Sequence, residues 1–148
     1  MTVALSGKDI AGQLEEKFPG SIEETGRESV VVKNSSLLAV AALLKDTDSL
    51  AFDYFNYVTA VDYYSYFECV YQLTSTKHNR SVVIKTRCYD RENPVVPSVI
   101  GLWQGADFQE REIYDLMGIK FEGHPNMKRL FLWDGFQGHP LRKDFIKW

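Results

Sequence analysis

The stretch Phe67-Glu-Cys-Val-Tyr-Gln-Leu-Thr74, followed after a short polar loop by Val82-Val-Ile-Lys-Thr-Arg-Cys88, decides the fold class of this chain. In both runs apolar side chains return at every second position, with Thr86 as the one polar member, and most positions between them are polar or charged. Successive side chains of a strand point to opposite faces, so this alternation predicts strands with one buried face and one mostly wetted face. The loop around residues 77–80 is short enough for a hairpin, and we therefore expect an antiparallel pair.

The chain before this hairpin predicts two helices and a further strand. Ser6 can cap a first helix, whose apolar side chains recur every four residues until a Pro-Gly pair ends it. Three consecutive valines predict a strand over 29–33, because β-branched residues favour extended backbone. Ser35 or Ser36 can then cap a second helix that is rich in alanine and leucine. With the aromatic residues gathered in 52–71, these elements predict an α+β fold, a two-layer domain with helices packed on a mostly antiparallel or mixed sheet.

The chain after the hairpin predicts a third long helix. Residues 98–103 can form a short helix, and Asp107 followed three residues later by Glu110 resembles a capping box. The helix that this box opens should end at Gly118. Beyond that glycine no periodic pattern of useful length follows, so we expect a single domain with an α+β core over 1–118 and an extended C-terminal tail over 119–148.

The predicted tail differs from the core in charge and in exposure. Residues 1–118 carry 11 basic and 17 acidic side chains, whereas residues 119–148 carry 6 and 3. The basic tail either meets an acidic surface or uses its charges to stay soluble. Its apolar side chains, such as Trp133 and Phe136, are poorly suited to water, so the tail should wrap its own domain or lie on another subunit. We expect it to be mobile or partner-bound in the isolated protein.

Composition excludes several classes of protein. At 148 residues with 45% hydrophobic side chains the chain can fold as one domain, and a net charge of −3 argues against nucleic-acid binding. The longest apolar run, residues 37–44, is too short to span a bilayer, and the first residues do not resemble a secretory signal. A soluble intracellular protein is therefore expected. Cys69 and Cys88 fit as small buried side chains and cannot hold a four-cysteine iron–sulfur cluster. Dinucleotide-binding, Walker A and nucleophile-elbow motifs are absent from the sequence.

Acidic residues and histidines are unusually dense towards the C-terminus, and this density suggests chemistry. Carboxylates with a histidine could catalyse proton transfer, and two histidines with a carboxylate could bind zinc. The spacing does not favour either, because His124 and His139 both precede proline and no ligand pair shares one helical face. A structural interpretation explains more: Arg111 and Asp115 are four residues apart and can pair on a helix, and the Gly-His-Pro tripeptides can form rigid corners.

Ordered motifs in this region carry a family resemblance. They are Glu110-Arg-Glu112, Tyr114-Asp-Leu-Met-Gly-Ile119, Gly123-His-Pro-Asn-Met127, Arg129 and Gly138-His-Pro-Leu-Arg-Lys-Asp-Phe145. In this order they resemble the signature of the C subunit of the proton-pumping NADH:quinone oxidoreductase, also known as NADH dehydrogenase or respiratory complex I.

The resemblance implies a non-catalytic subunit of the peripheral arm, which braces and assembles the cofactor-bearing subunits during electron transfer to quinone. It implies no cofactor in this chain, with FMN and iron–sulfur clusters held by other subunits. The implied partners are the large quinone-site subunit and the iron–sulfur subunits, on the inner face of the cell membrane, without nucleic acid or a membrane span. The residues expected to bind partners or to anchor the tail are Glu110, Arg111, Glu112, Asp115, His124, Arg129, His139, Arg142 and Lys143.

Two alternatives stay open at this point. The chain could be the homologous subunit of a membrane-bound energy-converting hydrogenase or of a quinone reductase that uses another donor. It could also be a free-standing small metal-dependent enzyme that uses the acid–histidine cluster.

Overall fold

The predicted hairpin forms the middle of the sheet. In the computed structural model, which describes residues 2–145, β5 (Phe67–Ser75) and β6 (Arg80–Cys88) pair antiparallel along their whole length, from Phe67 opposite Cys88 to Ser75 opposite Arg80. The other elements are β1 (Val3–Ala4), α1 (Gly7–Lys17), β2 (Ile22–Thr25), β3 (Val30–Val32), η1 (Asn34–Ser36), α2 (Leu37–Asp46), β4 (Tyr54–Asp62), β7 (Val95–Pro97), α3 (Ala106–Met117) and β8 (Lys120–Glu122). The α+β prediction is confirmed.

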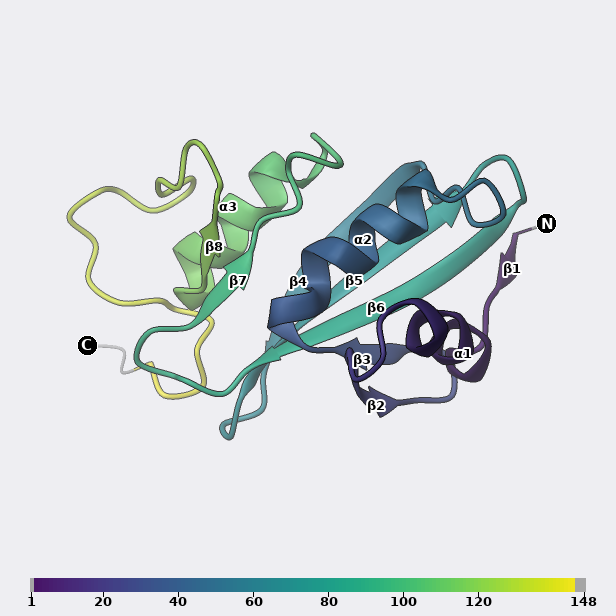
Figure 1. Ribbon diagram of the computed structural model, residues 1–148. Coiled ribbons are helices and arrows are strands. Elements are labelled where there is room, and N and C mark those ends of the chain that lie inside the picture. The colour runs from purple at the N-terminus through teal and green to yellow at the C-terminus, as the bar shows by residue number, and fades with distance from the viewer. Residues whose placement is uncertain (1, 146–148) are drawn as a thin grey trace.

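The main sheet is mixed, with strand order β2-β3-β6-β5-β4 (Figure 1). β6 pairs parallel with β3 near its middle and parallel with β1 at its start, so the two short strands follow one another along the same edge of β6. Antiparallel pairing joins β2 to β3 and β4 to β5. β4 is therefore the strand at one margin of the sheet, and α3 packs beside it.

The helices α1 and α2 cover one face of this sheet, as predicted (Figure 1). α1 is capped by Ser6, whose Oγ accepts from the backbone N–H of Asp9. Ser36 is the N-cap residue of α2, as one of the two predicted positions, but its side chain makes no capping bond and the 3-10 turn η1 leads into the helix.

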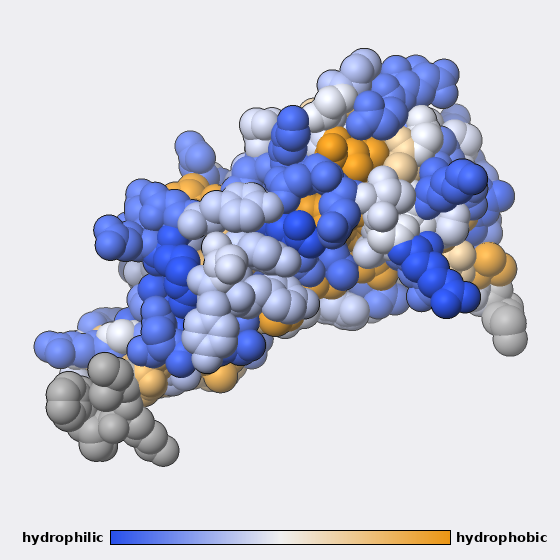
Figure 2. Space-filling model, turned by 90° about the horizontal axis from the view of Figure 1, so that it is seen from below, coloured by the Kyte–Doolittle hydropathy of each residue, from blue (hydrophilic) through white to orange (hydrophobic). Residues whose placement is uncertain are grey.

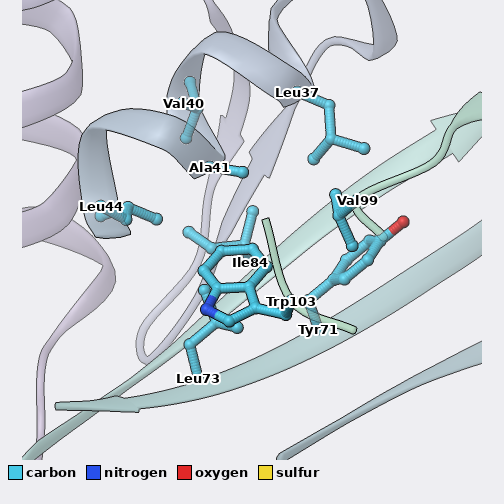
Figure 3. A pocket seen from close by; sticks show the side chains of 9 residues that line it. All are labelled: Leu37, Val40, Ala41, Leu44, Tyr71, Leu73, Ile84, Val99 and Trp103. Carbon is cyan, nitrogen blue, oxygen red and sulfur yellow. The ribbon is translucent and has the colours of Figure 1, made fainter. Parts of the chain in front are cut away.

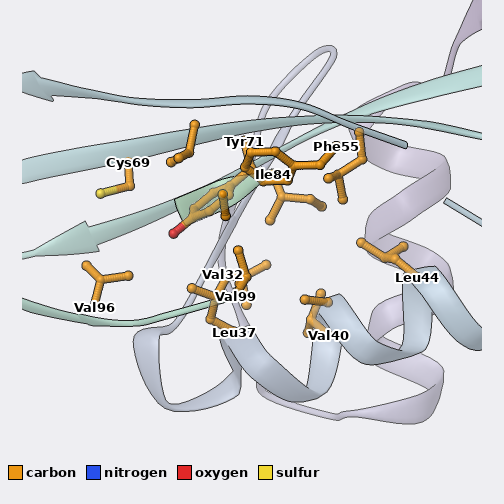
Figure 4. Close-up of a cluster of buried hydrophobic side chains, with 14 of the residues drawn as sticks. Val32, Leu37, Val40, Leu44, Phe55, Cys69, Tyr71, Ile84, Val96 and Val99 are labelled. Carbon is orange, nitrogen blue, oxygen red and sulfur yellow. The ribbon is translucent and has the colours of Figure 1, made fainter. Parts of the chain in front are cut away.

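The core lies between α2 and the sheet (Figure 4). Its members include Leu37, Val40 and Leu44 of α2 and Tyr71 and Ile84 of the hairpin, all nearly inaccessible to solvent. A small hollow lined only by apolar atoms stays between them and the loop before α3 (Figure 3). Cys69 and Cys88 are buried free thiols, and burial raises the pKa of both, so they act as the small core side chains that the sequence predicts.

The opposite face of the sheet carries the polar side chains of the alternating pattern. Glu68 belongs to this polar set but is buried, with only 3% of its surface exposed. Its carboxylate is covered by two cations of β6: Arg87 Nε lies 2.9 Å from Oε2 and Lys85 Nζ lies 3.6 Å from Oε1. Cross-strand ion pairs of this kind keep a charged side chain stable on a sheet without a covering layer.

A second, two-stranded sheet lies beside the main one and was not predicted. β7 and β8 pair parallel, with Val96 opposite Phe121, and α3 makes the crossover that parallel strands require. The predicted short helix over 98–103 is wrong, because this segment forms turns in which the N–H groups of Leu102 and Trp103 both bond to the carbonyl of Val99.

Candidate functional site

The site that carries the sequence signature is built on α3. The helix ends where predicted: Gly118 adopts φ 78° and ψ 15°, the left-handed conformation that glycine favours. It begins two residues earlier than the capping box requires, with Gly105 instead of Asp107 as N-cap, so that Asp107 lies in the first turn and caps nothing.

Glu110 is turned into the protein instead of closing a cap. It is fully buried and accepts from Ser98 Oγ at 2.5 Å and from the backbone N–H of Val99 at 3.0 Å. Burial raises the pKa of this carboxyl, while the two hydrogen bonds oppose the rise. Its role is to hold the turn after β7 against α3.

Asp115 fixes the chain that returns along α3. The side chain is fully buried, and Oδ2 accepts from the backbone N–H groups of Leu130, Phe131 and Leu132 at 3.2, 2.7 and 3.0 Å. Arg129 Nη1 lies 3.1 Å from Oδ1. Burial acts to raise the pKa of Asp115, but the three N–H donors and the guanidinium outweigh it and lower the pKa. One ionised carboxylate therefore sets the conformation of residues 129–132.

The predicted pairing of Arg111 with Asp115 is wrong. Arg111 donates instead to the carbonyl oxygens of Lys128 and Arg129, each at 3.2 Å. Arg111 and Asp115, one turn apart on α3, thus bind the same segment, residues 128–132. Arg111 binds carbonyl groups of that segment and Asp115 binds its N–H groups.

The first Gly-His-Pro tripeptide docks on the start of α3. The side chain of His124 is inaccessible to solvent, and its Nε2 lies 3.0 Å from Asp107 Oδ1. Its Nδ1 accepts from the backbone N–H of Asn126 at 3.0 Å, so Nε2 carries the ring proton and donates it to the backbone carbonyl of Asp107 at 3.3 Å.

The second Gly-His-Pro tripeptide completes the other end of α3. The last four carbonyl groups of a helix have no partner within it. Here the carbonyl of Tyr114 is bonded by Gly118 N–H, and the next three are bonded in order by His139 Nδ1, the N–H of Leu141 and Arg142 Nε. Burial, with the charges of Arg142 and Arg129, lowers the pKa of His139 and favours its neutral form.

A buried carboxylate outside the signature holds the end of the tail. Asp62, at the end of β4, is nearly inaccessible and forms a two-pronged pair with Arg91 at 2.6 and 2.9 Å. It also accepts from the backbone N–H groups of Tyr64 and Lys143. Arg142 stands beside this pair, donating to the carbonyl of Arg91. Nothing local in the sequence distinguishes Asp62, because all its partners but Tyr64 are distant in the chain.

The Asp62 cluster predicts acid sensitivity. The hydrogen bonds from Arg91 lower the pKa of Asp62 most, against the effect of burial. A carboxyl whose folded pKa lies below its unfolded value of about 4 stabilises the fold above that pH, and this contribution is lost as the pH falls through the folded pKa. We expect Asp62→Asn to lower the free energy of unfolding by about 2 kcal/mol at pH 7 and by less at pH 3. Urea titrations at both pH values test this, with Asp134→Asn, an exposed aspartate, as the control; equal losses at both would contradict it.

Glu112 differs from the other predicted site residues. It is exposed and forms no hydrogen bond or ion pair within residues 2–145. It borders a hollow of about 80 Å³ between α3 and β4, with Leu116 and Leu141 among the lining residues. Lys143 is also exposed, with its ammonium 5.0 Å from the centre of the Tyr64 ring. Binding of a partner by any of the nine residues stays a prediction.

The arrangement is that of a bracing network. Within residues 2–145, no three histidine, cysteine or acidic side chains come together as metal ligands would. In the same part of the chain no helix combines the length and apolar character that crossing a membrane requires. The face seen in Figure 2 is mainly polar, with separate apolar patches.

Comparison with known proteins matches this region and most of the core. Residues 30–147 fit the family model of the "Respiratory-chain NADH dehydrogenase, 30 Kd subunit". A C subunit of the NADH-quinone oxidoreductase of Rhizobium meliloti (strain 1021) is 39% identical over 135 residues, which cover 86% of this chain and 73% of the relative. The C subunit of the same enzyme from Cupriavidus metallidurans is 41% identical over 133 residues, covering 84% and 67%. In three dimensions, a chain of the membrane-bound sulfane sulfur reductase, an archaeal respiratory membrane complex, gives a TM-score of 0.74 at 27% identity and covers 95% of this chain and 85% of its own.

Proposed function

Because the chain belongs to the family of the 30 kDa subunit of respiratory-chain NADH dehydrogenase, we propose that it braces the cofactor-bearing subunits of such a complex. Its partners in this proposal are the large quinone-site subunit and the iron–sulfur subunits, at the inner face of the membrane. FMN and the clusters are held by those partners, and this chain contributes shape and rigidity.

The observation that carries the proposal is that side chains of the signature bond to backbone groups of their own chain. Glu110, Asp115, His139 and Arg142 each bond to backbone groups of the same chain. His139 and Arg142 also border an open hollow at the surface, whereas Glu110 and Asp115 are fully buried. Catalytic groups must reach a substrate, whereas His139 and Arg142 are bonded to carbonyl groups at the end of α3 and the two carboxylates of α3 hold the segments beside it. Such a network makes a rigid surface, as a subunit that positions others requires.

The proposed function is tested in the native host. Deleting this chain should remove most NADH:quinone reductase activity from membranes and leave the partner subunits unassembled, and the wild-type chain should restore both. A tagged wild-type chain should co-purify with a large quinone-site subunit and iron–sulfur proteins. Unchanged activity together with recovery of the chain alone would contradict the proposal.

A second candidate rests on the structural neighbour. The similarity to a chain of the membrane-bound sulfane sulfur reductase favours a related complex that uses another redox partner. The subunits that co-purify decide between the two: a flavoprotein that oxidises NADH supports the first, and its absence together with another redox module supports the second.

A further inference from the structure

Residues 128–143, which return along α3, expose large apolar side chains, whereas three cationic or histidine side chains of the signature are turned inward. Phe131 and Trp133 are 66% and 69% exposed, the two largest exposed fractions among the large hydrophobic side chains of residues 2–145. Arg129, His139 and Arg142 are half-buried against α3. The charged residues that the sequence marks for docking thus build the support, and apolar side chains of the tail lie on the surface.

These two aromatic side chains are held in place before any partner arrives. Asp115 binds the N–H groups of residues 130–132, which include that of Phe131. Trp133 packs edge-on against Phe136, with ring centres 6.1 Å apart, and the guanidinium of Arg129 lies 5.7 Å from the Phe136 ring. A preorganised loop loses little conformational entropy on binding, so its aromatic groups can contribute most of their buried area to affinity.

The charge around this loop indicates what it meets. Residues 119–145 carry five basic and three acidic side chains, in contrast to the acidic core. Lys120 and Lys128 are exposed and pair with no carboxylate of residues 2–145. A surface that offers aromatic groups and unpaired ammonium groups fits an apolar pocket bordered by carboxylates. A second copy of the chain is a poorer occupant, because copies with a net charge of −3 repel one another.

We infer that Phe131 and Trp133 are the anchor by which this chain docks into an apolar pocket, bordered by acidic side chains, on a neighbouring subunit of the same complex. The inference rests on the proposed function and names the side chains that perform it. Asp115, Arg111 and Arg129 are then positioning residues, which hold the loop that carries the anchor.

Alanine substitution tests the anchor. Aromatic hot spots at interfaces cost about tenfold or more in affinity when they are truncated. The double variant Phe131→Ala/Trp133→Ala should therefore reduce recovery of the large quinone-site subunit and iron–sulfur proteins with the tagged chain at least about tenfold, with an unchanged melting temperature of the isolated chain. Tyr54→Ala, which removes an aromatic side chain that is 52% exposed on β4, should leave recovery unchanged.

A photoreactive amino acid at position 133 identifies the pocket. In membranes it should form an adduct with one subunit of the respiratory complex, at an apolar site flanked by Asp or Glu, and the same group at position 54 should not. An adduct with a second copy of this chain, or at a basic surface, would overturn the inference. So would equal recovery with the double variant while the wild-type chain assembles. If the wild-type chain recovers no subunit of a respiratory complex, the proposed function itself fails.

Discussion

Replacing Asp115 with alanine should lower the free energy of unfolding by about 3–5 kcal/mol, the range measured when one partner of a buried ion pair is removed. The substitution leaves three backbone N–H groups without their acceptor and removes the carboxylate beside Arg129, whose guanidinium keeps the carbonyl groups of Asp115 and Gly138. Each unsatisfied buried donor costs about 1–3 kcal/mol, and relaxation of residues 129–132 towards water limits the sum. Urea unfolding of the isolated chain at neutral pH measures the loss.

The same variant also tests whether Asp115 holds residues 130–132 in place. Hydrogen exchange at residues 130–132 should become fast in Asp115→Ala, because their N–H groups lose the carboxylate. Asp134→Ala, which removes an exposed aspartate from the same segment, should change stability by less than about 0.5 kcal/mol. Wild-type stability in Asp115→Ala, or unchanged exchange at these amides, would show that the loop is held by other contacts.

Periodic patterns predicted the parts of the fold whose partners are close in sequence. The alternation over 67–74 and 82–88 predicted the hairpin, and Gly118 predicted the end of α3. β7 and β8 were missed because three-residue strands show no periodicity, and their pairing depends on a crossover through α3. The capping box failed for a related reason: Glu110 finds Ser98 and Val99, which only the tertiary fold brings within reach.

In the candidate site, too, the sequence predicted local features and missed those that depend on the tertiary fold. The sequence motifs located the segment, and residue types alone suggested ion pairs such as that of Arg111 with Asp115. Which acceptor a guanidinium finds depends on where the chain returns, and here it returns along α3 to offer backbone carbonyl groups. Asp62 was missed because its role depends on contacts between distant segments. The sequence marked the apolar side chains of the tail as a group, and only the structure shows that Phe131 and Trp133 are the ones most exposed.

Gly118→Ala should lower the free energy of unfolding by about 3 kcal/mol and disrupt the docking of the tail. A left-handed backbone costs a non-glycine residue about 1–2 kcal/mol. The new Cβ would also lie 2.6 Å from His139 Cδ2 and 2.6 Å from Arg142 Nη2. Neither side chain can move freely, because both bond to carbonyl groups at the end of α3, and displacing them would expose groups that cost about 1 kcal/mol or more each.

Gly123→Ala is the matched control for this steric effect. Gly123 has φ 90°, also in the left-handed range, but a Cβ there would meet nothing within 4 Å. The backbone cost is thus common to both variants, and the difference between their unfolding free energies, about 1–2 kcal/mol, measures the packing of His139 and Arg142 against the end of α3. If the two variants lose equal stability, the close approach at Gly118 contributes nothing. If only Gly118→Ala also weakens recovery of the partner subunits, the cap of α3 is what holds the docking segment in its binding conformation.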